Sequence, residues 1–128
     1  MLNEKSELKN KKILIVDDDL ISLTILEKML SHAGYDVIKA TNGKEALLRA
    51  KERQPDLAVL DIAMPELDGI NVATILKSDP QTKNVPIIFL SALVGEEIRK
   101  EISSVPGSSF LIKPFRKDDL LREIKQFL

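Results

Sequence analysis

Short runs of apolar residues alternate with amphipathic stretches along most of the chain. The apolar runs are rich in β-branched residues and have the length of buried strands. The amphipathic stretches carry apolar residues at helical spacing. The pattern predicts strands at 12–16, 35–39, 57–60, 87–90 and 110–112, and helices at about 23–33, from 44 to the break at Pro55, and at 70–77, 96–104 and 118–127.

Two of these helices carry more detailed signals. Asn42 and Glu45 are three residues apart at the start of the helix that begins near 44, which is the spacing of a capping box. In the helix at 70–77, the apolar pattern predicts an inward face made of Val72, Ile75 and Leu76.

The order of the elements predicts an α/β fold. Five successive strand-then-helix units favour a parallel sheet with helices on both faces, because right-handed crossovers make a doubly wound sandwich the simplest topology. A chain of 128 residues has room for one domain. We expect this domain at 11–128, preceded by a charged, aperiodic and flexible lead-in at 1–10.

Composition narrows the class of protein further. Hydrophobic content of 44% and charged content of 30% are typical of a water-soluble domain. The net charge of −1 gives no strong attraction to nucleic acid or to an anionic membrane. The chain has no cysteine, no secretory signal and no apolar run of membrane-spanning length. We therefore expect a cytoplasmic protein that binds neither nucleic acid directly nor membranes.

Polar residues follow the predicted strands where each strand ends. Asp17, Asp18 and Asp19 follow the first strand, and Asp61 follows the third. Ser91 follows the fourth strand, and Lys113 the fifth. Ligands of open α/β sheets bind just outside the carboxyl ends of the strands. If the first and third strands are neighbours, their carboxylates share one site.

Such a cluster of carboxylates needs a cation. At a separation of about 5 Å and an effective dielectric constant near 20, each pair repels by roughly 3 kcal/mol. A hard divalent cation relieves this repulsion, and oxygen ligands with room for water favour Mg²⁺. With the cation bound, the Asp61 carboxylate could attack phosphorus to form an acyl phosphate. Lys113 could then neutralise the transferring group, and the Ser91 hydroxyl could bond to one of its oxygens.

Each of these residues also has a purely structural interpretation. The aspartates at 17–19 could cap the following helix, and we assign only this role to Asp19. Asp61 could begin a turn, Ser91 could be an ordinary strand-end hydroxyl, and Lys113 could belong to a plain loop. The coincidence of polar residues at four strand ends favours one shared site.

The sequence resembles the receiver domain of two-component response regulators from about residue 11 to residue 128. The resemblance is carried by ILIVDD at 13–18, LDIAMP at 60–65 with DG at 68–69, LSA at 90–92 and FLIKPF at 110–115. It implies a flavodoxin-like fold, with a five-stranded parallel sheet in the order 2-1-3-4-5 and five helices on its two faces.

The resemblance also implies a role for individual residues in metal binding and phosphorylation. Asp61 matches the phosphoacceptor, and Asp18 matches the direct ligand of Mg²⁺ or Mn²⁺. Asp17 matches the acid that reaches the metal through water, and the backbone carbonyl of Ala63 completes the coordination by protein. Lys113 matches the lysine that contacts the phosphoryl group, and its bond to the following proline is cis in the family.

A second group of implied roles concerns switching. Ser91 matches the hydroxyl that moves toward the phosphoryl group, and Phe110 matches the aromatic residue that turns inward with it. In the family this movement reshapes the surface of the fourth helix, fifth strand and fifth helix, where downstream proteins bind and where phosphorylation can drive dimerisation. Two positions that often carry polar side chains are Ala63 and Leu93 here, so we predict slow hydrolysis of the phosphorylated form.

The predicted function is a switch in a phosphorelay, with a histidine kinase or a histidine phosphotransfer protein as the donor. Its own chemistry would be limited to metal-dependent self-phosphorylation and autodephosphorylation. A flavodoxin-like cofactor binder or a small phosphohydrolase is the main rival. It would need a glycine-rich phosphate loop or a separate general acid, and neither is evident: the chain has 5 glycines, none of them directly after the first strand. A binding domain that has lost phosphorylation is a third reading, which the intact set of site residues opposes.

Overall fold

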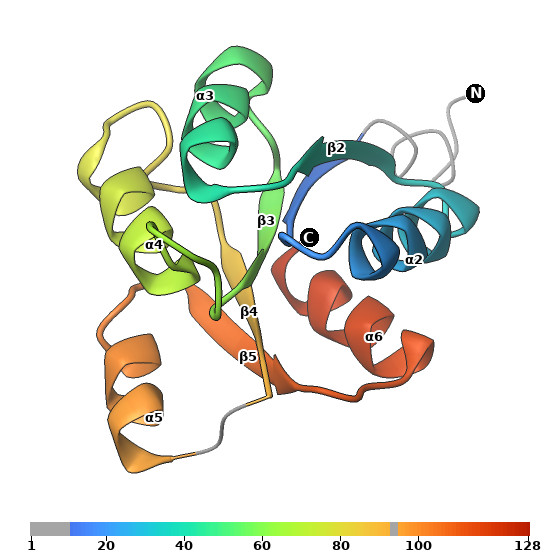
Figure 1. Cartoon of the computed structure of the whole chain (residues 1–128). Helices are drawn as coiled ribbons and strands as arrows, with labels where there is room; N and C mark the ends of the chain where they lie inside the picture. Colours follow the sequence, from blue (N-terminus) through green and yellow to red (C-terminus); the bar gives the residue numbers. More distant parts are fainter. Residues whose placement is uncertain (1–10, 93–94) are drawn as a thin grey trace.

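The computed structural model describes residues 11–92 and 95–128 and places a central sheet between two layers of helices (Figure 1). The predictions for residues 1–10 and for Leu93 lie outside the described residues. The strands are β1 (Lys12–Val16), β2 (Asp36–Ala40), β3 (Leu57–Asp61), β4 (Ile87–Ser91) and β5 (Ser108–Ile112). The helices are α2 (Leu20–His32), α3 (Gly43–Arg53), α4 (Gly69–Ser78), α5 (Glu96–Ser103) and α6 (Lys117–Phe127). Every predicted strand and helix is present, with bounds that differ by a few residues.

The five strands form one parallel sheet in the order β2-β1-β3-β4-β5. This arrangement confirms the predicted fold class and strand order. β1 and β3 are neighbours, and Val16 pairs with Leu60. The residues that follow this pair along the two strands are Asp17 and Asp61, so the strand register alone brings the two carboxylates together at one edge of the sheet.

The sheet divides the apolar interior into two cores. Alternate residues of each strand face opposite sides, so Leu14 and Val16 belong to one core while Ile13 and Ile15 belong to the other. α3, α4 and α5 cover the first core, and α2 and α6 cover the second (Figure 1). All residues of β3 and β4 are buried, as expected for strands that are covered on both faces.

The inward face of α4 differs from the prediction. Val72 and Leu76 are buried as expected, but the side chain of Ile75 is 45% exposed. The buried stripe consists of Gly69, Val72, Ala73 and Leu76, which follows the helical repeat. The prediction for Ile75 is therefore wrong, because the smaller Ala73 occupies the inward position.

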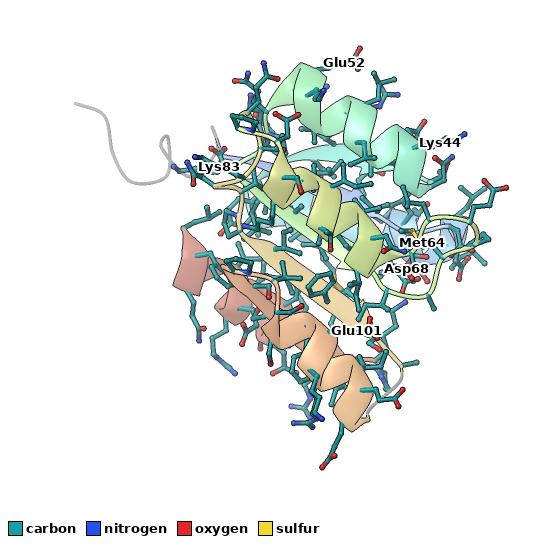
Figure 2. All side chains as sticks on the ribbon, turned by 90° about the vertical axis from the view of Figure 1, so that its left-hand side faces the viewer. Lys44, Glu52, Met64, Asp68, Lys83 and Glu101 are labelled. Carbon is teal, nitrogen blue, oxygen red and sulfur yellow. The ribbon has the colours of Figure 1, made fainter. Side chains whose placement is uncertain are left out.

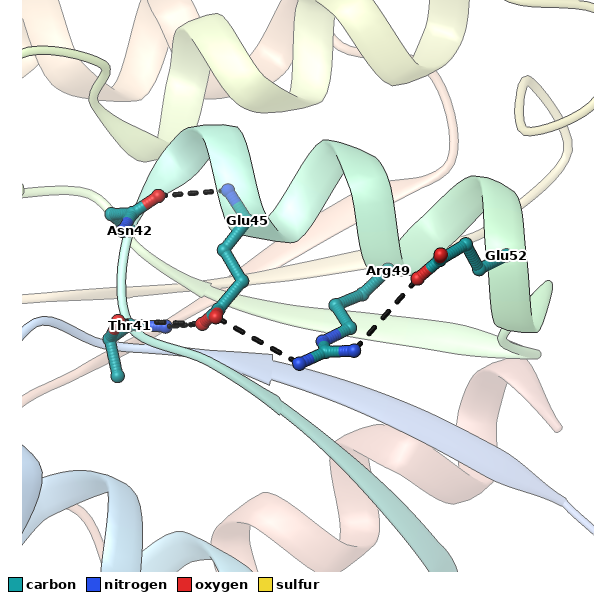
Figure 3. A network of polar contacts seen from close by, with 5 residues as sticks. All are labelled: Thr41, Asn42, Glu45, Arg49 and Glu52. Atoms are coloured by element: carbon teal, nitrogen blue, oxygen red, sulfur yellow. Dashed lines mark hydrogen bonds and ion pairs between the residues drawn. The ribbon is translucent and has the colours of Figure 1, made fainter.

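A network of polar contacts fixes the start of α3 (Figure 3). Asn42 Oδ1 accepts a hydrogen bond from the backbone N–H of Glu45 at 2.8 Å, which confirms the predicted cap. Glu45 Oε1 accepts from the N–H of Thr41 at 2.7 Å, one residue before the position expected for a capping box. Arg49 lies 3.9 Å from Glu45 and 3.8 Å from Glu52. These contacts tie the helix to the loop that leaves β2.

None of the helices in the described part of the chain is long and apolar enough to cross a membrane.

Candidate metal centre

Four strand ends meet at the carboxyl edge of the sheet and bring the predicted site residues together. Asp17 follows β1, Asp61 is the last residue of β3, Ser91 is the last residue of β4, and Lys113 follows β5. The strand register places these residues side by side across the sheet, because Asp61 pairs with Leu90 and Ser91 pairs with Ile112. The predicted convergence is therefore observed at all four strand ends.

The three acidic residues form a compact cluster. Asp17, Asp18 and Asp61 each offer one carboxylate oxygen, and these oxygens all lie within 4.8 Å of one another. Asp17 is 1% exposed and Asp61 is 6% exposed, whereas Asp18 faces solvent. The separation matches the value assumed from the sequence, so the repulsion expected there applies to the structure.

Asp17 has one oxygen that the protein does not satisfy with a hydrogen bond. Its Oδ1 accepts from the backbone N–H of Asp19 at 2.9 Å. Its buried Oδ2 has no hydrogen-bond partner among the described residues and lies 3.5 Å from the Lys113 ammonium. A buried carboxylate oxygen without a donor is costly, so this atom is suited to a ligand that carries positive charge.

Lys113 partly compensates the cluster. Its Nζ lies 3.5 Å from Asp17 Oδ2 and also 3.5 Å from Asp61 Oδ1. The Lys113–Pro114 peptide bond is cis, as the family resemblance implied. Three carboxylates and one ammonium group leave the site with a formal charge of −2, which one divalent cation would neutralise.

The donor set fits Mg²⁺ in chemistry and in size. All the side-chain ligands are oxygens, which Mg²⁺ prefers, and two oxygens on opposite sides of an octahedral Mg²⁺ ion are roughly 4.2 Å apart. The observed limit of 4.8 Å is slightly wider. The two values are close enough for the three carboxylates to share one ion.

Burial raises the pKa of the Asp61 carboxyl above its ordinary value. The Lys113 ammonium opposes this effect, the charge of Asp17 adds to it, and a hydrogen bond from the Ala63 N–H again lowers the pKa. The net direction is upward because the loss of solvation outweighs the nearby ammonium. Ionised Asp61 is therefore destabilised in the protein without a metal.

The loop after β3 brings α4 against the backbone of Asp61. Asp68 caps α4, with its Oδ1 accepting from the N–H of Asn71 at 2.9 Å. A Cβ atom at Gly69 would lie 2.4 Å from the backbone oxygen of Asp61, so only glycine allows this approach. Figure 2 shows Met64 and Asp68 at the end of the molecule where Lys44 lies, away from Lys83. Asp68 and Gly69 thus fix the start of α4 against the backbone of Asp61.

The remaining predicted residues are Asp19, Ala63, Ser91 and Phe110, which have different surroundings. Asp19 is a helix cap, because its Oδ1 accepts from the N–H of Ile21 at 3.1 Å and its Oδ2 accepts from the Ser22 hydroxyl at 3.0 Å. Ser91 is 3% exposed, and Ala63 is exposed at the mouth of the site. Phe110 is half-buried on β5.

The sequence reasoning missed an apolar cavity beside the cluster. The cavity has a volume of about 490 Å³ and is lined by Ile25, Met29 and Phe115 as well as by Asp17 and Lys113. The nearby side chains of α2 are unusually open for apolar residues: the exposed fractions are 65% for Leu20, 72% for Ile21 and 49% for Ile25. The buried residues of α2 are Leu23, Leu26 and Leu30. Large apolar residues outside this helical repeat were the signal in the sequence that could have indicated an exposed apolar surface.

Comparison with known proteins agrees with the geometry. The family model of the response regulator receiver domain matches residues 13–125. The alkaline phosphatase synthesis transcriptional regulatory protein PhoP of Bacillus subtilis is 41% identical over 120 residues, which cover 93% of this chain and 49% of PhoP. The chain thus spans about half the length of that relative.

Solved structures give the same result. The chemotaxis protein CheY4 of Vibrio cholerae has a TM-score of 0.88 at 30% identity and covers 92% of this chain and 98% of its own. The response regulator TrrA of Thermotoga maritima, crystallised in complex with Mg²⁺ and BeF, has a TM-score of 0.82 at 34% identity. The match covers 93% of this chain and 100% of the TrrA chain. By sequence, by fold and by the acidic cluster, the chain belongs to the family of response regulator receiver domains.

Proposed function

We propose that Asp61 accepts a phosphoryl group from a histidine kinase or a histidine phosphotransfer protein, and that the phosphorylated domain then binds other proteins differently. The observation that carries this proposal is the buried Asp61 carboxylate, which lies within 4.8 Å of two other carboxylates and 3.5 Å from the Lys113 ammonium. This arrangement combines a nucleophile, a cation site and a fixed positive charge, which are the groups that phosphoryl transfer requires.

The cation proposed for the site is Mg²⁺ or Mn²⁺. Its ligands would be Asp18 and Asp61 directly, Asp17 through water, and the backbone carbonyl of Ala63. The ion would offset the negative charge that develops on the phosphoryl oxygens. The formal charge of −2 on the cluster and the unsatisfied oxygen of Asp17 support this assignment. The complex of TrrA with Mg²⁺ and BeF supports it for a relative.

In the proposed reaction, an oxygen of Asp61 attacks the phosphorus of a phosphohistidine. The new bond joins this oxygen to phosphorus, the bond between phosphorus and the histidine nitrogen breaks, and the electron pair of that bond stays on the nitrogen. The Lys113 ammonium, which lies 3.5 Å from both Asp17 and Asp61, would contact a phosphoryl oxygen and offset its charge. The hydroxyl of Ser91 donates a hydrogen bond to another phosphoryl oxygen.

The donor would contact the apolar surface beside the site. A donor must present its phosphoryl group at the mouth of the acidic cluster, where the cavity and the exposed side chains of Leu20, Ile21 and Ile25 lie. Exposed apolar patches of this kind mark protein contacts. A small donor such as acetyl phosphate would not need this surface.

The output of the switch would pass through Ser91 and Phe110 to the surface formed by α5, β5 and α6. In this proposal, Ser91 moves toward the phosphoryl group and the ring of Phe110 turns inward. α5 is suited to respond, because it has eight residues, one buried residue (Ile102) and no side-chain cap at Gly95. Downstream proteins, or a second copy of the chain, would recognise the altered surface.

The chemistry of the chain itself would be limited to metal-dependent self-phosphorylation and autodephosphorylation. We expect the phosphorylated form to last for minutes or longer, because neither Ala63 nor Leu93 can orient an attacking water. Decay of the acyl phosphate after removal of the donor measures this lifetime. Ala63→Gln should shorten it, and a half-life of seconds in the natural chain would contradict the prediction.

A cytoplasmic location is also part of the proposal, since a chain without cysteine suits a reducing compartment.

The decisive experiment exposes the chain to acetyl phosphate, with and without Mg²⁺. Intact mass should increase by one phosphoryl group in the natural chain and in Asp36→Asn, a matched change at an exposed site on β2. Asp61→Asn should show no increase, and EDTA should abolish the increase in every variant. Phosphorylation of Asp61→Asn to the same extent would overturn the assignment of the acceptor.

A further inference from the structure

One contact joins α5 to Phe110, the aromatic residue of the proposed switch. The guanidinium carbon of Arg99 on α5 lies 5.5 Å from the centre of the Phe110 ring on β5. α5 lies beside β5 at the edge of the sheet (Figure 1). β5 is the edge strand of the sheet, next to β4.

The distance is within the range of a cation–π interaction, which extends to roughly 6 Å from the ring centre. Phe110 also packs against the core that contains Phe89 and Ile102, so one part of the ring meets the core while a guanidinium group covers another. Within residues 11–92 and 95–128, no carboxylate forms an ion pair with Arg99. The ring is thus the partner of this charge in the described structure.

The same contact holds α5 in place. Ile102 is the one fully buried residue of the helix, and Ile98 is half-buried against the same core. The helix begins at Gly95 without a side-chain cap. With so few attachments, the loss of one contact changes the stability of α5 more than it would change a longer, capped helix.

We propose that Arg99 is a positioning residue for the switch: its guanidinium group holds the Phe110 ring in the half-buried position described here and thereby opposes activation. The inference rests on the proposed function, in which this ring turns inward after phosphorylation. Inward rotation would separate the ring from Arg99, so the contact stabilises only the arrangement described here. α5 would lose an attachment in the same step, which couples the ring to the surface that partners recognise.

The size of the effect follows from the interaction. A cation–π contact at a partly exposed site changes an equilibrium by about two- to fivefold. Removing it should raise the population of the inward form by this factor. The apparent affinity for beryllofluoride in the presence of Mg²⁺ should rise by the same factor, because that mimic binds the activated form better. A merely structural defect would instead weaken binding.

The test uses the full chain labelled with 4-fluorophenylalanine at its four phenylalanines. The Phe110 resonance is identified by its loss in Phe110→Leu. Arg99→Ala is compared with Arg99→Lys, which keeps a cation, and with Lys100→Ala, which removes the exposed charge of the next residue on the same helix. Fluorine NMR reports the ring, and titration with beryllofluoride reports activation.

In the natural chain, beryllofluoride and Mg²⁺ should shift the Phe110 resonance. Arg99→Ala should shift it part of the way without the mimic and should bind the mimic about two- to fivefold more tightly. In Arg99→Lys, the position of the Phe110 resonance and the affinity for the mimic should lie between those of the natural chain and of Arg99→Ala. In Lys100→Ala, both should match the natural chain. If the natural chain responds but Arg99→Ala behaves identically to it, the role of Arg99 is refuted. If the resonance of the natural chain does not respond at all, the proposed switch itself fails, and the positioning role fails with it.

Discussion

Replacing Asp61 with asparagine should stabilise the protein when no divalent metal is present. Asparagine has nearly the same shape as aspartate, so the change removes a charge with little change in packing. Asp61 is 6% exposed, and burial raises the pKa of its carboxyl. A raised pKa means that the folded protein favours the neutral form of this group, and asparagine imitates that form.

The magnitude follows from the distances in the site. At an effective dielectric constant near 20, carboxylate oxygens 4.8 Å apart repel by about 3.5 kcal/mol. Under the same assumption, the Lys113 ammonium at 3.5 Å attracts Asp61 by about 4.7 kcal/mol. With a weaker repulsion from the exposed Asp18, these charges nearly balance, so the cost of burying the Asp61 charge decides the sign. We expect a gain on the order of 1 kcal/mol, or about 4 °C in Tm.

The effect has a definite dependence on pH. The folded pKa of Asp61 lies above its unfolded value, so the cost of ionising Asp61 is absent below the unfolded pKa, near pH 3.8. The cost increases as the pH rises through the folded pKa. The stability difference between Asp61→Asn and the natural chain should therefore be small near pH 3.5 and complete at pH 7. Saturating Mg²⁺ should stabilise the natural chain by more than the variant, because the cation compensates the same charge.

Thermal and urea unfolding monitored by circular dichroism measure these differences, in EDTA and in Mg²⁺, from pH 3.5 to pH 8. Asp36→Asn makes the same chemical change at an exposed position on β2 and should stay within about 0.5 kcal/mol of the natural chain. A lower stability of Asp61→Asn than of the natural chain at pH 7 in EDTA would refute the stabilising effect of the substitution. That result would mean that the attraction of Lys113 outweighs the cost of burial.

Three further predictions concern the fold. Gly69→Ala should cost more than about 2 kcal/mol in urea unfolding and should weaken Mg²⁺ binding, because the new Cβ would lie 2.4 Å from the backbone oxygen of Asp61; an unchanged midpoint would contradict the close approach. Gln54→Gly should add about 0.5 kcal/mol to the unfolding free energy, because Gln54 ends α3 at φ 47°, where glycine has no steric penalty; a loss of stability would count against this account. Asp79→Ala should lower the Tm at pH 7, because hydrogen bonding to the Gln81 N–H and pairing with a lysine hold the pKa of Asp79 below its ordinary value. That stabilisation is lost as the pH falls through the folded pKa, which lies below 3.8, so the difference in Tm should narrow as the pH falls below that value. A gap independent of pH would exclude the charge as its cause.

The sequence predicted the elements and the location of the site because both depend on local patterns. Unbroken apolar runs mark strands that are buried on two faces, and β3 and β4 are buried at every residue. Polar residues directly after such runs must lie at the carboxyl edge of the sheet. The distance between Asp17 and Asp61 could be anticipated as soon as β1 and β3 were taken as neighbours.

Other features depend on contacts between distant elements, which a pattern in one segment does not encode. Ile75 and Ala73 are both apolar, and only the packing of α4 on its neighbours decides which of them is buried. The contact between Arg99 and Phe110 joins residues eleven positions apart on two elements, with no spacing rule that links them. Glu45 bonds to Thr41 because of the path of the chain as it leaves β2.

The division of the interior by the sheet has a consequence for how the domain could change over evolution or by engineering. Substitutions under α2 repack residues such as Leu26 and Leu30, whereas α5 rests on Ile102 in the opposite core. Residues without shared neighbours usually contribute independently to stability. The surface that would recognise a donor and the helix that would report to a partner can thus accumulate mutations separately, and donor specificity could be exchanged between related chains while the response of α5 is kept.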